Sequence, residues 1–321
     1  MEPTTIDIPS VSQNVISRLG DVILGKQDVL QTALVCFFCQ GHLLLEDIPG
    51  VGKTILARSL ARISGCEFKR IQFTPDLLPS DVVGATIYNQ QANQFDVRKG
   101  PIFAQVILAD EINRATPKTQ SALLEAMDER NVTIDGVGYP LPQPFVVIAT
   151  QNPIEYEGTF PLPEAQLDRF FMKLSLGYPN KRDEVEILTS QESGHPIERL
   201  EPVLQATDMM LIQKQIMSVF VAEPIKKYIV DLAQHTRSHA DVFIGASPRG
   251  SLALMKAAQA RAAIDGRDYV LPDDVQALTE AVLSHRVLLN VSARMNEVSV
   301  SSLLAELTAQ VPAPGGSFKR M

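Results

Sequence analysis

The protein has 321 residues, of which 45% are hydrophobic and 21% are charged, so the chain is an ordinary globular protein long enough for two domains. Its formal net charge of −8 opposes binding to a phosphate backbone, and a nucleic-acid partner would require a local basic patch. No secretory pattern follows Met1, and no stretch approaches the roughly 20 apolar residues that span a bilayer, which predicts a cytoplasmic protein without membrane insertion.

Two regions of different character follow each other along the chain. Residues 1–20 predict an N-terminal helix entry, and residues 21–178 alternate short apolar runs with helical patterns, which is typical of an α/β domain with a parallel sheet covered by helices. The predicted strands are 42–45, 68–72, 105–109 and 145–149. Residues 179–310 predict an all-α domain, with helices at 181–192, 207–219, 223–239, 247–265, 272–284 and 296–307, and residues 311–321 predict a flexible tail.

The clearest motif in the first domain is a P-loop, which lies between a predicted strand and a helix that starts near Ile55. The residues predicted to bind nucleotide here are Pro49, Gly50, Val51, Gly52, Lys53, Thr54 and Ile55. The glycines let backbone amides converge on phosphates, Lys53 adds a positive charge, and Thr54 offers its hydroxyl to Mg²⁺. Asp47 stands where the consensus has glycine, so the loop must close there without glycine's conformational freedom. The alternative is a chance loop.

Two further strands end in polar residues. Asp110 and Glu111 follow the apolar run 106–109, and Asn152 follows the run 146–149. Because parallel strands deliver their carboxyl ends to one edge of a sheet, Asp110 could bind Mg²⁺ and the nucleotide, while Glu111 and Asn152 could polarise and orient the attacking water. The alternatives are solvated acids at a strand end and an Asn-Pro turn.

With their surroundings, these motifs resemble the MoxR family of AAA+ ATPases, from Val22 to about His285. The segments that carry the resemblance are the P-loop, 110–115 (Asp-Glu-Ile-Asn-Arg-Ala), 120–127 (Gln-Ser-Ala-Leu-Leu-Glu-Ala-Met), 149–153 (Ala-Thr-Gln-Asn-Pro), 162–170 (Leu-Pro-Glu-Ala-Gln-Leu-Asp-Arg-Phe) and 247–249 (Ser-Pro-Arg). The resemblance implies a P-loop AAA+ sheet sandwiched by helices and followed by a helical lid.

The resemblance also implies roles for residues outside the three motifs. Arg169 would be an arginine finger that reaches the neighbouring subunit's nucleotide, and Arg249 would be the sensor-2 arginine. Gly25 and Lys26 resemble the stretch that lies along adenine. The alternatives are an ion pair of Arg169 with Asp168 or Glu164, and a solvated helix start for Arg249.

The function implied by the resemblance is a Mg²⁺-dependent ATPase that assembles into a ring, of six subunits, and remodels or matures protein clients. Cofactor or metal insertion into a client and a partner with a von Willebrand factor A domain also belong to this expectation. The alternatives are a nucleic-acid motor of the MCM kind and a nucleotide-gated binding switch with negligible turnover.

Two segments bear on the choice between a protein remodeller and a nucleic-acid motor. Residues 84–98 and 131–141 each predict a hairpin. They resemble the insertions that MoxR proteins share with magnesium chelatase and MCM helicases. Residues 131–144 contain Asp135 and neither Lys nor Arg, which disfavours a helicase.

The remaining candidate metal ligands, two cysteines and two histidines, are better explained as ordinary structural or surface residues. Cys36 and Cys39 form a lone Cys-x-x-Cys in an apolar helical pattern, which predicts a buried helix face and no zinc site. His235 and His239 are four residues apart on a predicted helix, but no further ligands are evident, so we expect surface or partly packed histidines.

Overall fold

The structure, a computed structural model, describes residues 5–153, 158–192 and 194–315. The predicted N-terminal helix is α1 (Ile8–Gly20). Most of the predicted tail, from residue 316 to 321, lies outside the described residues. Among the residues that the structure describes, no helix has the length and apolar composition needed to cross a bilayer.

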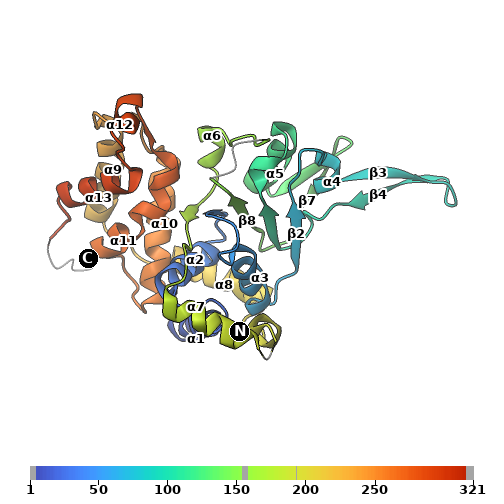
Figure 1. Ribbon diagram of the computed structural model, residues 1–321, viewed down its shortest axis with the longest axis horizontal. Coiled ribbons are helices and arrows are strands. Elements are labelled where there is room, and N and C mark those ends of the chain that lie inside the picture. Colours follow the sequence, from blue (N-terminus) through green and yellow to red (C-terminus); the bar gives the residue numbers. More distant parts are fainter. Residues whose placement is uncertain (1–4, 154–157, 193, 316–321) are drawn as a thin grey trace.

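Five parallel strands form the central sheet, in the order β2-β5-β8-β1-β9 (Figure 1). Their bounds are β1 (Leu43–Glu46), β2 (Phe68–Gln72), β5 (Val106–Asp110), β8 (Val146–Gln151) and β9 (Met172–Leu174). The four predicted strands are confirmed, with ends shifted by one or two residues at most. Strand β9 was not predicted, because three residues with a lysine at the centre make no apolar run.

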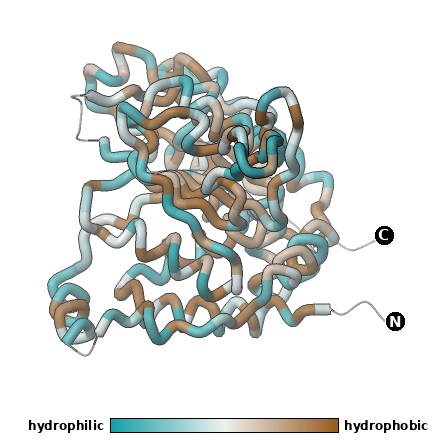
Figure 2. Tube along the Cα trace, turned by 90° about the vertical axis from the view of Figure 1, so that its right-hand side faces the viewer, coloured by the Kyte–Doolittle hydropathy of each residue, from teal (hydrophilic) through white to brown (hydrophobic). Residues whose placement is uncertain are grey.

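Alternate residues of each strand face opposite sides of the sheet, and each side has its own apolar core. On one side Leu45 and Leu108 pack with helices α1, α2 (Gln27–Phe38) and α3 (Lys53–Ile63). On the other side Leu44 and Ile107 pack with α4 (Pro79–Val83) and α5 (Pro117–Glu129). Figure 2 shows the strands as a brown, apolar centre enclosed by helices. The predicted sandwich of helices around a parallel sheet is therefore confirmed.

Both predicted hairpins are present as isolated antiparallel pairs. They are β3 (Gly84–Asn89) with β4 (Gln94–Lys99), and β6 (Asn131–Ile134) with β7 (Val137–Pro140). The first projects far from the body of the molecule (Figure 1). Along it the rings of Tyr88 and Phe95 lie 5.2 Å apart, centroid to centroid, and both are exposed. The hairpin is thus a protruding arm with aromatic side chains in solvent.

We call residues 181–310 the lid, and it is mainly helical as predicted. Its helices are α7 (Lys181–Gln191), α8 (Ala206–Met217), α9 (Glu223–Ser238), α10 (Pro248–Ile264), α11 (Pro272–Leu283), α12 (Val291–Met295) and α13 (Val300–Gln310). The predicted helix 296–307 starts too early, because Ser299 caps α13 by accepting from the Ser302 amide. The other short elements are α6 (Glu164–Leu167), the 3-10 turns η1 (Ile112–Arg114), η2 (Pro196–Arg199) and η3 (Ser284–Arg286), and an antiparallel pair in the lid, β10 (Val242–Ile244) with β11 (Leu288–Leu289).

A buried arginine fastens the lid to the end of the sheet domain. Arg286 donates through Nε to Asp168 Oδ1 at 2.7 Å and through Nη2 to the Phe170 carbonyl at 2.5 Å. Ser247 Oγ donates to the other oxygen of Asp168 at 2.8 Å. One apolar cluster also runs from the sheet into the lid helices. The domain boundary at residue 178 therefore stays a prediction.

Candidate active site

The P-loop connects β1 to α3 and closes with two glycines in the left-handed region. Gly50 has φ 86° and Gly52 has φ 99°, conformations that residues with a Cβ rarely adopt. Gly52 is also the N-cap of α3, so the first free amides of that helix open beside the loop. The geometry is that of an anion-binding turn at a helix N-terminus.

Asp47 stands at the non-consensus position and does not have a positive φ, so the loop needs no glycine there. Its carboxylate contacts both the loop and the segment after β9, and Oδ1 accepts from the Ile48 amide at 3.0 Å. Oδ2 accepts from Ser175 Oγ at 3.0 Å and from the amides of Leu176 at 2.6 Å and Gly177 at 2.7 Å. The departure from the consensus is thus used for a contact that glycine could not make.

A cavity of about 310 Å³ lies in front of the P-loop. Its lining is Pro49, Gly50, Gly52, Lys53, Thr54, Ile55, Asp110, Glu111, Thr150 and Asn152. The structure therefore brings the three sequence motifs together at the carboxyl edge of the sheet. Of the predicted P-loop residues only Val51 is absent from this lining. The Lys53 amine donates to the carbonyls of Asp47, at 2.5 Å, and of Gln151, at 3.3 Å.

Asp110 is almost buried at the end of β5 and has two partners that the sequence did not reveal. Thr150 Oγ1 donates to Asp110 Oδ1 at 2.7 Å. Arg70, on the neighbouring strand β2, donates to Asp110 Oδ2 through Nη2 at 2.6 Å and through Nε at 3.0 Å. An arginine of the chain itself therefore occupies the carboxylate predicted to bind Mg²⁺.

Glu111 is also engaged. Its Oε2 accepts from Gln72 Nε2 at 2.8 Å and from Arg114 Nη1 at 3.0 Å, and its φ of 56° places it in the left-handed region. The Glu111 amide donates to Thr150 Oγ1 at 2.8 Å, which ties β5 to β8. Asn152, just beyond β8, is 5% exposed and lines the same cavity as the two acids.

The two candidate arginines lie together, away from the cavity lining. Arg169 Nε is 3.0 Å from Asp128 Oδ2, and Arg249 Nη2 is 3.1 Å from Asp128 Oδ1. The alternative partners considered for Arg169 were wrong in this respect, because Asp168 is taken by the lid and the acid that pairs with Arg169 comes from α5. The Asp128 carboxylate thus forms ion pairs with both guanidinium groups.

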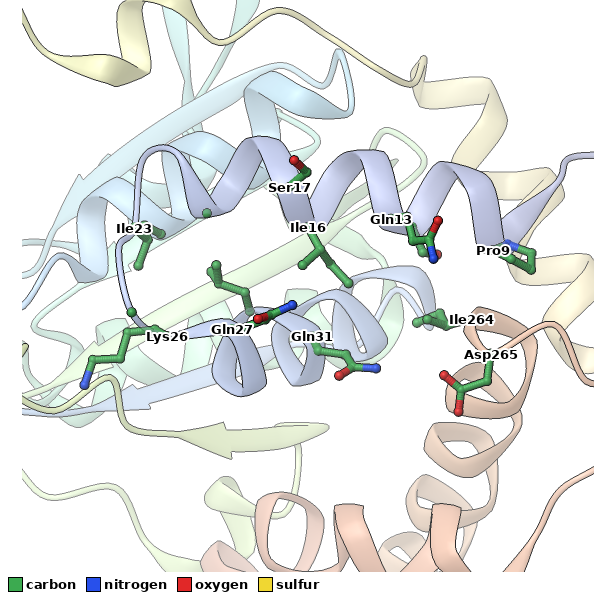
Figure 3. Close-up of a pocket in the computed structure, with 14 residues that line it drawn as sticks. Pro9, Gln13, Ile16, Ser17, Ile23, Lys26, Gln27, Gln31, Ile264 and Asp265 are labelled. Carbon is green, nitrogen blue, oxygen red and sulfur yellow. The ribbon is translucent and has the colours of Figure 1, made fainter. Parts of the chain in front are cut away.

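Gly25 and Lys26 are not in the P-loop cavity. They line a larger cavity of about 760 Å³ between α1, α2 and the end of α10. Figure 3 shows Lys26 at one end and Asp265 at the other, with Gln27 and Gln31 between them. The Lys26 amine donates to the Tyr178 carbonyl at 2.8 Å. The predicted adenine contact is therefore untested by this geometry.

His235 and Cys36 lie as the sequence predicts, whereas Cys39 follows the end of α2 and is only partly buried. His235 is exposed and contacts the Asp231 carbonyl, while Cys36 is buried, and burial raises the pKa of its thiol well above the ordinary value. Within the described ranges no group of three or more His, Cys, Asp or Glu residues is placed to hold a metal ion.

Comparison with known proteins agrees with this geometry. Residues 42–172 match the ATPase family associated with various cellular activities (AAA), and residues 234–307 match the AAA lid domain. A solved structure from Cytophaga hutchinsonii superposes with a TM-score of 0.88 at 39% identity and covers 96% of both chains. The fold and the site thus define a AAA+ ATPase with a helical lid.

Full-length relatives narrow the class further. The chain is 50% identical to the protein YeaC of Bacillus subtilis, over 96% of both chains. It is 41% identical to Chaperone MoxR1 of Mycobacterium tuberculosis, over 94% of this chain and 82% of that one, and 31% identical to Protein MoxR of Paracoccus denitrificans, over 93% and 95%. The chain belongs to the MoxR family of AAA+ ATPases.

Proposed function

We propose that the protein hydrolyses ATP with Mg²⁺, as a ring of its own copies, and uses the turnover to remodel partner proteins. The observation that carries the proposal is the P-loop cavity, where Lys53, Asp110, Glu111 and Asn152 meet on one edge of the sheet. The MoxR1 relative is named a chaperone, which supports protein clients as the purpose of the turnover.

The residues present suit ATP and Mg²⁺. The amides around Gly50 and Gly52 would hold phosphate oxygens, and Lys53 would turn to them from its two carbonyl partners. Thr54 and Asp110 line the same cavity and supply the oxygen ligands that Mg²⁺ prefers. Bound there, Mg²⁺ would neutralise charge that develops on the transferring phosphoryl group.

Glu111 and Asn152 would act on the attacking water. The Glu111 carboxylate would accept its proton, and the Asn152 amide would orient it from the other side of the cavity. In the structure Gln72 and Arg114 both donate to Oε2 of this carboxylate, which fixes the orientation of the proton acceptor.

Two variants test the proposal. Lys53→Ala removes a phosphate contact, so we expect it to abolish nucleotide binding. Glu111→Gln removes only the proton acceptor, so it should still bind ATP while hydrolysis falls by about 10²–10⁴-fold. Calorimetric titration and phosphate release measure the two effects. A Glu111→Gln variant that hydrolyses ATP at the wild-type rate would contradict the assignment, and a wild type that binds ATP without turnover would favour the binding switch.

A motor on nucleic acid is the second candidate, favoured only by the two insertions. Residues 131–144 offer no basic side chain, and the net charge of −8 repels phosphate, so we expect no tight binding to single- or double-stranded DNA at physiological salt. Fluorescence anisotropy checks this prediction. ATP hydrolysis that rises on addition of DNA would reverse the ranking.

The identity of the client is a separate question. A ring locked with ATP by Glu111→Gln should retain a client that the wild type releases, and copurification with that variant would identify it. A protein with a von Willebrand factor A domain is the partner that the family resemblance suggests. Retention equal to that of the nucleotide-free Lys53→Ala variant would argue against an ATP-driven cycle of client binding.

A further inference from the structure

The chain passes from β9 into α7 through residues 175–180, which we call the linker. Three of its donors converge on one oxygen, Asp47 Oδ2: the Ser175 hydroxyl at 3.0 Å and the amides of Leu176 at 2.6 Å and Gly177 at 2.7 Å. Asp47 belongs to the P-loop and lies about 130 residues away in sequence. The only chain connection that runs from the sheet into α7 is thus held by the phosphate-binding loop.

Asp47 is nearly buried where it makes this contact. The residue is 7% exposed, and its second oxygen accepts from the Ile48 amide at 3.0 Å. Among the described residues no ion pair includes this carboxylate, so hydrogen bonds stabilise its charge. A buried carboxylate without a cationic partner is retained only where its donors are fixed in place.

The backbone of the same residue contacts the phosphate site. Its carbonyl accepts from the Lys53 amine, and its amide donates to the Gln151 carbonyl at the end of β8, at 3.2 Å. Lys53 is the side chain that must turn when phosphate oxygens arrive. Any change at Lys53 therefore acts on a residue whose own side chain holds the linker.

We propose that Asp47 is a positioning residue that transmits occupancy of the phosphate site to the linker and so to the lid. The inference rests on the proposed function, because it requires ATP in the P-loop. When Lys53 leaves the Asp47 carbonyl for the phosphates, Asp47 shifts, and its three linker donors shift with it. Lys26 holds the linker at the Tyr178 carbonyl, 2.8 Å away, which gives it a second fixed point.

The position allows a sharp test, since Asp47→Gly restores the P-loop consensus and removes the three linker contacts, together with the hydrogen bond from the Ile48 amide. Hydrogen exchange measured by mass spectrometry reports the linker in residues 172–180 and the loop in residues 47–56. In the wild type a non-hydrolysable ATP analogue should alter exchange in both segments. In Asp47→Gly it should alter the loop alone, with nucleotide affinity within about threefold and kcat lowered at least about tenfold, because one hydrogen bond to a charged group already accounts for about a tenfold effect.

Two further variants act on the same contact. Asp47→Asn keeps one acceptor oxygen and should show an intermediate response of the linker, and Ser175→Ala removes one of the three donors without touching the loop, so it should weaken the response. Asn180→Ala is the control, because it removes the cap that the linker gives to α7, where Asn180 accepts from the Asp183 amide at 2.9 Å, and leaves Asp47 in place, so the linker should still respond to nucleotide.

The outcomes separate the two proposals. Loss of nucleotide binding in the wild type would defeat the proposed function itself. A wild-type linker response in Asp47→Gly would overturn the inference, since the signal would then travel by another route. Failure of Asp47→Gly to bind nucleotide would also overturn it, because Asp47 would then serve the phosphate site directly.

Discussion

At the residue scale, Arg70 has the largest consequence for metal binding. Its guanidinium holds Asp110 Oδ2 at 2.6 Å, in the place of the cation that Asp110 is expected to bind. The Arg70 side chain is 50% exposed, so the pair is weak and can be exchanged. In Arg70→Ala the metal meets no competing charge, and the Mg²⁺ concentration needed for tight binding of a fluorescent ADP should fall by about two- to fivefold.

The neighbouring strand supplies a matched control. Lys69 lies next to Arg70 on β2 but pairs with Glu67, so Lys69→Ala removes the same charge without freeing Asp110. Its Mg²⁺ titration should follow the wild type. A requirement for more Mg²⁺ in Arg70→Ala would mean that Arg70 assists the bound nucleotide rather than competing with the metal.

The predictable residues of the site are those whose function is local in sequence. Gly50, Gly52 and Lys53 act through consecutive backbone and side-chain groups, so a short motif reveals them. Arg70 could not be found this way, because its contact depends on β2 lying beside β5, some 40 residues further on. Asp128 was missed for the same reason, since it comes from α5, whereas Arg169 lies in the turn after α6 and Arg249 lies on α10.

At the element scale, the His42 side chain ties the start of β1 to β8 and to helix α5. Its Nδ1 accepts from the Val147 amide at 3.0 Å and its Nε2 contacts the Met127 carbonyl at 3.1 Å, which suits the neutral ring protonated at Nε2. Burial lowers the pKa of His42 to about 4. Because the folded pKa is below that of the unfolded chain, the contribution to stability is full above pH 6.5 and is lost as the pH falls toward 4.

A titration of stability tests this assignment. Between pH 6.5 and 4 this group should lower the free energy of unfolding by about 3 kcal/mol, as measured by urea denaturation. His42→Gln cannot take up the proton and should show a shallower decline, although His285, whose pKa burial also lowers, will still contribute. His235→Gln is the control on an exposed helix face. Equal slopes for wild type and His42→Gln would contradict the prediction.

Helices and strands could be predicted where apolar residues repeated with a helical or strand period over enough residues. Strands β1, β5 and β8 are mostly buried runs of four to six residues, and the longer lid helices carry their own amphipathic pattern. Strand β9 has three residues and β11 has two, so neighbouring strands rather than their own sequence determine them. The start of α13 was missed because the cap at Ser299, rather than apolar periodicity, sets it.

At the scale of the whole molecule, the P-loop cavity is incomplete in one respect. In the described part of the chain its lining contains Lys53 but no arginine, while Arg169 and Arg249 lie together on Asp128. Both arginines are partly exposed and share one acid, so a partner with a stronger negative charge could draw them away. The phosphates bound by a second copy would be such a partner, and the expected ring would bring them near.

Mixed rings give the decisive test of this arrangement. A Lys53→Ala subunit cannot hold ATP but keeps Arg169, whereas an Arg169→Ala subunit holds ATP but lacks the finger. Lys53→Ala alone should therefore show no turnover, and Arg169→Ala alone should lose about 10³–10⁵ in rate if the finger acts in trans. In an equal mixture about one interface in four pairs an intact finger with an intact nucleotide site, because head-to-tail contacts combine two different surfaces. ATP hydrolysis should then recover to roughly a quarter of the wild-type rate. A mixture that stays inactive although subunit exchange is demonstrated, or monomers that hydrolyse ATP at the full rate, would show that Arg169 does not serve the neighbouring site.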